Sequence, residues 1–407
     1  MSRKSIVGLD IGTYQVKVVV AEQNDDAHSL PKIIGVGHAE SKGLRHGYII
    51  NQTDAIRSIR KAIRQAEKSS NVKIERAYVS IGGIGLSSYV SEGSVMISRA
   101  DNEITELDLE KVGRNSQDNI PKNVIQNKRI IHQIPIEYKI DGKAILGKNP
   151  VGLKAVKLEV KTLFITSLIH HFQEIIQTVG NAGIEISDVM AAPLAAGLVT
   201  LSKAEKIAGC VLANIGSETV SIIVYEDDLP ISMEVFPIGS NDITNDIALG
   251  LKISLEDAEK IKKEHNDSFA YPDLPKKKLQ EIISARFSDI FELIDAHLKK
   301  NGKSGLLPAG IVITGGGAGI VNIADLAKIT MKLPSKVADL KEDNEDFKKI
   351  VGNQNIKVKD ATWSVAYGLC VFGLYADNEG SIGNVGGIKL IKKIIQKISQ
   401  WFRKFLP

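Results

Sequence analysis

Two segments, one in each half of the chain, share a pattern that suits phosphate binding. Each has an apolar run, then Asp or Asn, Ile, Gly and a hydroxyl residue, and then a second apolar run. The residues that define the two segments are Asp10, Gly12, Thr13 and Lys17, and Asn214, Gly216, Ser217, Glu218 and Thr219. A tight hairpin of this composition can present backbone N–H groups to a phosphate oxygen. Either glycine alone could simply permit a left-handed turn. Two hairpins of one design indicate a duplicated fold with a nucleotide held between its halves.

A third segment joins a strand to a cluster of glycines. The apolar run from Gly310 to Thr314 leads directly into Gly315, Gly316 and Gly317. A helical pattern follows from Val321 to Lys328. Glycines let the backbone approach a ligand closely, and a helix N-terminus is electropositive. Because glycine-rich turns between strand and helix occur in many α/β folds, this segment supports nucleotide binding only together with the two hairpins.

Glu259 and Lys262 are three residues apart in an amphipathic run from Leu255 to Lys263, so they share one face of a helix. The structural interpretation of this pair is a solvated ion pair. The functional interpretation is a carboxylate for ribose hydroxyls and a lysine that flanks an adenine. The spacing leaves both interpretations open.

The elements that position these residues must come from more than one folding unit, because the chain has 407 residues. The net charge is +4, of which the last twenty residues contribute +6, so the remainder carries −2. The body is therefore not a basic nucleic-acid-binding protein. Cys210 and Cys370 lie in apolar segments without metal or redox spacing, which favours core packing in a reducing compartment. The N-terminus lacks the apolar run of a signal peptide, so we expect a cytoplasmic protein.

The last twenty residues, Ile388 to Pro407, form a basic amphipathic pattern at helical spacing. Its apolar stripe consists of Ile391, Ile394, Ile395, Ile398, Trp401, Phe402 and Phe405. The opposite side carries Lys389, Lys392, Lys393, Lys397, Arg403 and Lys404, with no acidic residue among them. This pattern is typical of a helix that lies in the plane of an anionic membrane. A helix packed on its own domain usually has mixed charge, and a peptide that binds in a groove is the remaining alternative.

A segment rich in glycine and polar residues, 376–387, precedes this helix and has the composition of a flexible linker. The lysines prevent the terminal segment from spanning a bilayer, which needs about 20 mostly apolar residues. The sequence therefore predicts attachment to a membrane surface.

Taken in order, these segments resemble the actin-like ATPase superfamily. The two hairpins resemble its two phosphate motifs, and the run from Ile311 to Gly319 resembles its adenosine motif. Ala191 to Gly197 and Thr362 to Tyr375 resemble its two connecting helices. The resemblance implies a two-lobed α/β fold in which duplicated mixed sheets surround a nucleotide cleft.

Within that superfamily the chain is similar to the FtsA family of bacterial cell-division proteins over nearly its full length. The similarity is carried by AYVSIGGIGLSSYVSEGSVMISR, PIGSNDITNDIALGLKISLEDAEKIK, TWSVAYGLCVFGLY and the terminal amphipathic helix. It implies a first core domain of residues 1–83 and 164–193, with a small α+β domain inserted at 84–163. It implies a second core domain of residues 194–226 and 307–375, with a subdomain at 227–306. The linker 376–387 and the membrane-targeting helix 388–407 complete the expected organisation.

The resemblance implies ATP and Mg²⁺ as ligands and a role for each motif residue. Asp10 would hold Mg²⁺ through water, and Thr13 and Lys17 would meet the β- and γ-phosphates. Glu259 and Lys262 would line the nucleoside. Residues 216–219 would form the opposing phosphate loop, and the glycines 315–317 would pass behind the α-phosphate and ribose. One carboxylate suffices for Mg²⁺, which keeps several waters.

One residue departs from the superfamily pattern. The second phosphate loop of hydrolysing members usually begins with Asp, and this chain has Asn214. Asn keeps the shape but lacks the negative charge that orients the Mg²⁺ shell or an attacking water. We therefore expect ATP binding with slow or negligible hydrolysis.

The resemblance also implies partners. These are further copies of the chain in head-to-tail filaments, anionic lipids of the inner leaflet, later division proteins, and the tubulin-like protein FtsZ, met mainly by Glu226 to Leu306. The rival interpretations are an actin-like scaffold of a pilus or secretion machine, a small-molecule kinase and a chaperone ATPase. The scaffold needs no terminal amphipathic helix, Asn214 is a poor catalytic base for the kinase, and no substrate-binding domain follows Tyr375.

Overall fold

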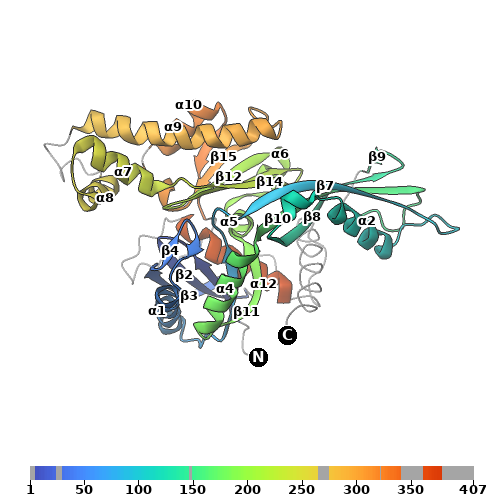
Figure 1. Cartoon of the computed structure of the whole chain (residues 1–407), viewed down its shortest axis with the longest axis horizontal. Coiled ribbons are helices and arrows are strands. Elements are labelled where there is room, and N and C mark those ends of the chain that lie inside the picture. The colour runs from blue at the N-terminus through green and yellow to red at the C-terminus, as the bar shows by residue number, and fades with distance from the viewer. Residues whose placement is uncertain are drawn as a thin grey trace.

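The computed structural model describes residues 5–23, 30–145, 149–264, 275–320, 322–340 and 361–377. The predicted terminal helix at 388–407 and residues 378–387 of the predicted linker lie outside these ranges. Within the described ranges, two lobes and a projecting small domain can be followed in Figure 1. No helix in the ranges given is long and apolar enough to cross a membrane.

The first lobe is built on a mixed sheet with the strand order β11-β6-β1-β2-β3. Strands β1, β2 and β3 are antiparallel neighbours. Strand β6 pairs in parallel with β1, and β11 pairs in parallel with β6. The strands are β1 (Ser5–Ile11), β2 (Gln15–Glu22), β3 (Lys32–Glu40), β6 (Arg76–Ile81) and β11 (Glu185–Ala191). A short hairpin, β4 (Leu44–Arg45) and β5 (Tyr48–Ile49), links β3 to the helix that follows.

Helices cover both faces of this first sheet. The helices α1 (Gln52–Ser70) and α4 (Ile169–Asn181) pack on one face. The helices α5 (Ala192–Thr200) and α12 (Ser364–Asp377) pack together on the other, where a Cβ at Gly8 of β1 would collide with Ala366 of α12. The packing of α1 requires glycine at position 37 of β3, where any Cβ would overlap the Ala62 carbonyl.

The second lobe repeats the topology of the first. Its sheet has the order β14-β13-β12-β15-β16, again with three antiparallel strands and two added in parallel. The strands are β12 (Cys210–Ile215), β13 (Val220–Glu226), β14 (Leu229–Phe236), β15 (Gly310–Thr314) and β16 (Ser335–Val337). The two predicted hairpins are thus equivalent elements, β1–β2 and β12–β13, of a duplicated fold.

Helices of the second lobe pack against this sheet and extend beyond it. They are α6 (Lys203–Ala208), α7 (Ser240–Leu251), α8 (Leu255–Glu264), α9 (Lys276–Lys300), α10 (Ile323–Met331) and the short 3₁₀ turn η1 (Gly316–Gly319). Apolar residues of α7, α8 and α9 share one core with the second sheet. The sequence places a separate subdomain at 227–306, but β14 within that range is a strand of the main sheet, because it pairs with β13 along its whole length.

The small domain inserted between β6 and β11 has its own core. Its sheet has the order β7-β10-β8-β9, and α2 packs on β7 and β10. Its elements are β7 (Ser87–Met96), α2 (Glu106–Asp118), α3 (Lys122–Ile125), β8 (Lys128–Ile140), β9 (Lys143–Ala144) and β10 (Lys157–Leu168). Ile104, Leu109 and Val112 pack against Leu158 in this core. In Figure 1 the domain projects from the lobes, and Ser88 joins its base to Met233 of β14 through two hydrogen bonds.

Helix α12 and the preceding 3₁₀ turn η2 (Ala361–Trp363) differ from the predicted domain division. The sequence assigns residues 307–375 to the second core domain, but α12 contacts β1, β2 and β6 of the first sheet. Residues on all sides of α12 are buried, as expected for a helix enclosed between α5 and a sheet. Close packing against α5 depends on Gly368, where a Cβ would overlap the Ala195 carbonyl.

Candidate nucleotide-binding site

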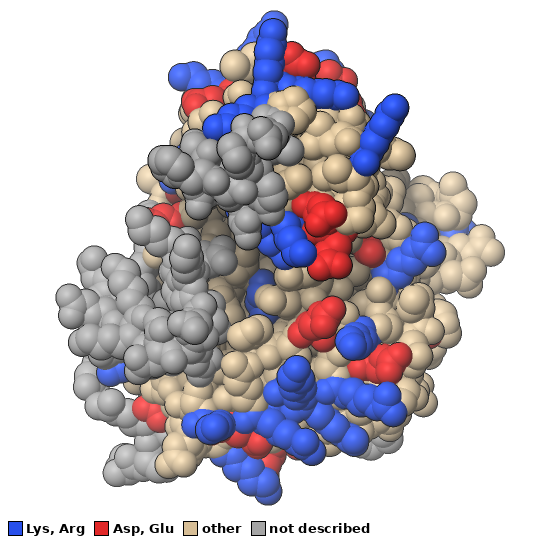
Figure 2. Space-filling view, turned by 90° about the vertical axis from the view of Figure 1, so that its left-hand side faces the viewer, with Lys and Arg blue, Asp and Glu red and all other residues tan. Residues whose placement is uncertain are grey.

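A cavity of about 700 Å³ lies between the two lobes. Its size falls in the range of small-molecule and cofactor sites, about 300–1,000 Å³. Figure 2 shows the face onto which it opens, with a hollow near the centre and charged side chains of both signs at the rim. The predicted residues that line it are Asp10, Gly12, Thr13, Lys17, Asn214, Gly216, Ser217, Thr219, Glu259, Lys262, Gly315, Gly316 and Gly317. The structure therefore brings together all of the residues predicted for the site except Glu218.

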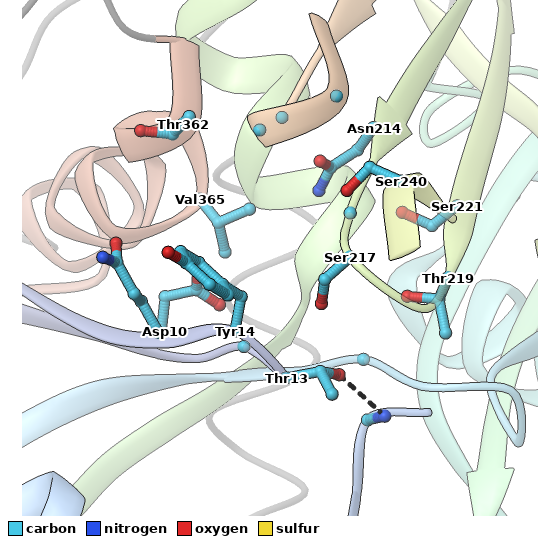
Figure 3. Close-up of a pocket in the computed structure, with 18 of the residues that line it drawn as sticks. Asp10, Thr13, Tyr14, Asn214, Ser217, Thr219, Ser221, Ser240, Thr362 and Val365 are labelled. Carbon is cyan, nitrogen blue, oxygen red and sulfur yellow. Dashed lines mark hydrogen bonds between the residues drawn. The ribbon is translucent and has the colours of Figure 1, made fainter. Parts of the chain in front are cut away.

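The two hairpins reach the cavity with the same turn. The backbone N–H of Gly12 donates to the Gln15 carbonyl at 3.2 Å, and the N–H of Gly216 donates to the Thr219 carbonyl at 2.8 Å. In both turns the glycine is the residue directly before the hydroxyl side chain. Figure 3 shows Thr13 from the first hairpin, and Ser217 and Thr219 from the second, around one space. The remaining backbone groups of two matched turns thus surround that space from both sides.

Asp10 and Lys17 are direct cross-strand partners in the β1–β2 hairpin. Ser80 Oγ donates to Asp10 Oδ1 at 2.8 Å, which fixes one carboxylate oxygen. Burial raises the pKa of Asp10, and Lys17 and the Ser80 hydrogen bond partly oppose that rise. Lys17 Nζ donates to the Thr362 carbonyl at 2.8 Å and lies 5.9 Å from the Trp363 ring. A divalent cation near Asp10 would lower its pKa and stabilise the carboxylate.

The single carboxylate of Asp10 suits a magnesium ion that is held mainly by water and phosphate oxygens. The described part of the chain contains no group of three or more His, Cys, Asp or Glu side chains that could hold a metal. Mg²⁺ does not need one, because it is usually bound by one or two carboxylates together with water and phosphate oxygens. The carboxylate of Asp10 at the cavity wall provides such a ligand.

Thr13 is held by a contact that joins distant parts of the first lobe. The N–H of Gly47, in the β4–β5 hairpin, donates to Thr13 Oγ1 at 3.0 Å (Figure 3). Gly47 has φ of +82° and lies so close to Gly83 that a Cβ on it would overlap the Gly83 backbone. Three segments therefore meet at this corner of the cavity, and glycine at position 47 is required both by φ and by the close approach.

The glycine cluster passes directly behind the second hairpin. Gly315 has φ of +89°, and a Cβ there would overlap Asn214 Oδ1. A Cβ at Gly317 would overlap the Ile215 side chain. At Gly316 and Gly319 an added Cβ would meet nothing within 4 Å. The cluster thus packs on β12 with one side and leaves backbone open to the cavity with the other.

Glu259 and Lys262 form a buried network rather than a solvated ion pair. Lys262 is only 7% exposed, and its Nζ lies 2.6 Å from Glu259 Oε2, 2.7 Å from Thr244 Oγ1 and 3.0 Å from the Ser240 carbonyl. Burial lowers the pKa of Lys262. Burial opposes ionisation of Glu259 as well, but hydrogen bonds from Lys262 and Thr244 hold its pKa below the ordinary value. These hydrogen bonds position the pair at the cavity wall.

Glu218 differs from its prediction because its carboxylate turns away from the cavity. Glu218 Oε2 accepts a hydrogen bond from the backbone N–H of His46 at 2.6 Å, and His46 Nδ1 lies 3.1 Å from the Glu218 carbonyl oxygen. A second contact crosses the cleft nearby, where Lys263 Nζ donates to Tyr14 Oη at 3.3 Å and lies 5.4 Å from the ring centroid. Both contacts join the first lobe to the second.

Several lining residues were not found from the sequence. They are Ile11, Tyr14, Gln15, Gly47, Ser80, Gly82, Gly83, Ala192, Ser221, Ser240, Asn241, Lys263, Gly319, Ile320, Thr362, Ser364 and Val365. The Gly82-Gly83 doublet directly after a strand was an available signal, since it resembles the glycine cluster of the second lobe. The other residues reach the cavity through contacts between distant segments and have no local pattern.

Comparison with known proteins agrees with this architecture. The family model "Cell division protein FtsA" matches residues 211–368, and the model "SHS2 domain inserted in FTSA" matches residues 83–166. A cell division protein FtsA of Borreliella burgdorferi is 31% identical, over 99% of both chains. That of Bacillus subtilis is 31% identical over 97% of this chain and 88% of its own. That of Pseudomonas aeruginosa is 28% identical over 98% of both.

Solved structures show the fold at much lower identity. A PilM-PilN type IV pilus biogenesis complex contains a chain that matches 91% of this one with a TM-score of 0.66 and 16% identity. MreB5 of Spiroplasma citri bound to ADP covers 91% with a TM-score of 0.50 and 14% identity. These similarities confirm the expected actin-like, two-lobed fold with a small domain inserted in the first half. Because a relative 31% identical is matched over 99% of both chains, the chain belongs to the FtsA family of cell division proteins.

Proposed function

We propose that this chain is an ATP-binding, self-polymerising division protein that anchors a ring of FtsZ to the cytoplasmic face of the membrane at the division site. The observation that supports it most is the cavity between the lobes, which is lined from both sides by matched hairpins and behind by the glycine cluster. Family membership connects that cavity to cell division. Recruitment of later division proteins is part of the same proposal.

In this proposal the nucleotide phosphates lie between the two hairpins. Asp10 holds Mg²⁺ through water, while Thr13, Lys17 and the turn 216–219 provide donors to the phosphates. Glu259 and Lys262 would line the nucleoside, and hydrogen bonds with Thr244 hold the carboxylate and the amine in place. Mg²⁺ supplies charge neutralisation at the phosphates.

Hydrolysis is slow or negligible in this proposal because Asn214 replaces a carboxylate. Asn214 lines the cavity and packs against Gly315, so the position is close to the nucleotide but neutral. A neutral amide does not orient a water or the Mg²⁺ shell as a carboxylate would. A rate of phosphate release comparable with brisk superfamily members, and abolished by Asp10→Ala, would contradict this part.

Membrane attachment is assigned to residues 388–407, which lie outside the described residues. Each large apolar side chain of the tail would contribute about 1 kcal/mol on partial burial, and each basic residue up to about 1 kcal/mol at an anionic surface. Ordering the helix offsets much of this. One tail is then a reversible anchor, and an array of protomers in a filament would hold by avidity.

The experiment that tests the proposal is co-sedimentation with anionic vesicles, with ATP and purified FtsZ present or absent. We expect the full chain to bring FtsZ down with the lipid. The double substitution Trp401→Glu and Phe402→Glu should release the protein from vesicles and leave ATP binding intact, as measured by titration calorimetry. Loss of both properties together would instead place the tail within the folded body. Binding of lipid without FtsZ would retain the anchor and reject the partner.

The alternative is an actin-like scaffold of a pilus or secretion machine. A PilM-PilN pilus biogenesis complex shares the fold, but 16% identity supports the fold alone. The relatives matched over nearly the whole chain are cell division proteins. A chain that binds no vesicle in the experiment above would favour the scaffold.

A further inference from the structure

Helix α1 carries a stripe of basic side chains on its outer face. The stripe consists of Arg57, Arg60, Lys61, Arg64 and Lys68, all of them exposed. At about 100° per residue these five positions fall within an arc of about 100°, opposite the buried Ala55, Ile59, Ala62 and Ala66. The stripe extends for about 16 Å along the helix. Figure 2 shows Lys and Arg side chains gathered over the lower part of the face on which α1 lies.

Nearby carboxylates neutralise little of this charge. Asp54 pairs with Arg57 at 3.3 Å, and the Arg57 side chain remains 76% exposed. Arg60 donates to the Asn181 and Ala182 carbonyls at the end of α4. Lys61, Arg64 and Lys68 form no ion pair with any carboxylate in the described part of the chain. Since the chain without its last twenty residues has a net charge of −2, this concentration of positive charge is local.

The stripe approaches one edge of the first sheet, namely the edge that is formed by the starts of its parallel strands. The described part of the chain leaves the first lobe at this edge. Strands β1, β3, β6 and β11 all start at the edge away from the cavity, because Asp10 near the end of β1 lines the cavity. Helix α1 ends there, since Ser70 packs on Gly35 in the first half of β3. Helix α12 ends there too, since Gly373 packs on Ile6 and Tyr78 near the starts of β1 and β6.

The terminal segment therefore begins close to this edge. Residues 378–387 could span at most about 35 Å even if fully extended. A tail helix at 388–407 that lies on a membrane would hold this edge of the first lobe within that distance of the lipid headgroups. Within that reach the first lobe can turn so that the stripe comes to about one Debye length, 8–10 Å, from the headgroups, where a positive surface attracts anionic lipid.

We propose that the basic stripe of α1 is a second membrane contact, which binds an anionic lipid bilayer and orients the first lobe on it. This inference rests on the proposed attachment through the tail. The charged side chains of a folded helix do not insert into the bilayer core. The stripe therefore contributes through electrostatic attraction, and its contribution to lipid affinity depends strongly on salt. The tail supplies burial of apolar side chains, and the stripe restricts the angle at which the body sits.

The test uses the full chain with vesicles of phosphatidylglycerol and phosphatidylcholine. The stripe variant is Lys61→Glu with Arg64→Glu and Lys68→Glu. The matched control is Lys276→Glu with Lys277→Glu and Lys278→Glu, which makes the same charge change at exposed positions that begin α9 of the second lobe. At about 50 mM salt we expect the stripe variant to bind at least tenfold more weakly and the control to change by less than about twofold. The difference should disappear at about 500 mM salt.

A second measurement does not depend on the triple variant folding. The native Cys210 and Cys370 are both buried, so a thiol-reactive fluorophore can be directed to Lys68→Cys or, as its control, to Lys277→Cys. We expect nitroxide-labelled headgroups to quench the fluorophore at position 68 and not that at position 277. ATP binding by calorimetry serves as the check that each variant is folded.

The outcomes separate this inference from the attachment itself. If the unchanged chain binds no vesicles, both are wrong. If it binds, and the stripe variant binds equally at every salt concentration without quenching at position 68, attachment stands and the stripe inference is overturned. If the stripe variant keeps its lipid affinity and loses binding to FtsZ, the stripe is a protein-binding surface and the inference is overturned as well.

Discussion

Replacing Glu218 with alanine should weaken nucleotide binding even though its carboxylate faces away from the cavity. Glu218 belongs to the second lobe, and it accepts the backbone N–H of His46, in the first lobe, at 2.6 Å. The substitution removes this contact across the cleft, and leaves the contact of His46 Nδ1 with the Glu218 carbonyl and that between Tyr14 and Lys263. Any effect on affinity then acts through closure of the lobes and not through a lost contact with the nucleotide.

The magnitude follows from the type of hydrogen bond and its exposure. A hydrogen bond to a charged group contributes about 1.5–3 kcal/mol to stability. Both partners of this one are only partly buried, so the lower end, about 1.5 kcal/mol, applies. If only the closed state holds the nucleotide, the substitution raises the free energy of that state relative to the open state by this amount. The dissociation constant then rises about tenfold. Most of the change should appear in the dissociation rate.

The assay combines titration calorimetry with ATP and Mg²⁺ and a stopped-flow chase of a fluorescent ATP analogue. Glu256→Ala is the matched control, because Glu256 is 82% exposed and pairs with Lys260 of the same helix, α8. We expect the control to leave both constants unchanged. An unaltered dissociation rate in Glu218→Ala, or an equal loss in both variants, would refute the role of this contact in closure.

Three further predictions concern the cavity and the core. Gly315→Ala should destabilise the fold by about 2–4 kcal/mol, seen as a lower melting temperature, because φ is +89° and a Cβ would overlap Asn214 Oδ1; Gly319→Ala, with open space around it, should not, and equal losses would reject the packing argument. Asn214→Asp should raise the rate of phosphate release above that of the unchanged chain, and an unchanged rate would show that the missing charge is not what limits turnover. His132 is buried and accepts the Ala191 N–H at Nε2, and burial lowers its pKa to about 3. Since the folded pKa lies below the unfolded value, its contribution is complete above about pH 6.5 and is lost as pH falls toward 3, by about 1.4 kcal/mol per unit. His132→Gln should therefore flatten the loss of stability between pH 7 and 5.5 in urea unfolding, and an identical pH slope would contradict this.

The hairpins and the glycine cluster could be predicted from the sequence because their signals are local. A turn such as that of Gly12 is closed by a residue three positions away, so glycine, hydroxyl and apolar runs suffice to identify it. The duplication could be predicted as well, because the same local motif occurs once in each half of the chain. Helix α8 was predicted from the spacing of apolar residues between Leu255 and Lys263, and the structure has it at Leu255–Glu264.

Contacts between distant segments could not be predicted in the same way. Ser80 reaches Asp10 across 70 positions, and Gly47 reaches Thr13 across 34. Nothing near Glu218 in the sequence distinguishes a carboxylate that faces phosphate from one that binds a backbone N–H of the opposite lobe. The place of α12 was missed for a related reason: a helix that is apolar all round signals burial, but not the sheet on which it is buried.

The arrangement of the lobes gives nucleotide binding a mechanical consequence in the proposed function. The hairpin with Asp10 and helix α12 belong to the first lobe, while the second hairpin and α7–α9 belong to the second. If the tail and the stripe of α1 hold the first lobe on the membrane, closure around ATP moves the second lobe relative to the lipid. The proposed FtsZ-binding region, Glu226 to Leu306, would then change its height or angle above the membrane with the nucleotide state. A protein that hydrolyses slowly would hold that position for as long as ATP stays bound, which suits an anchor better than a motor.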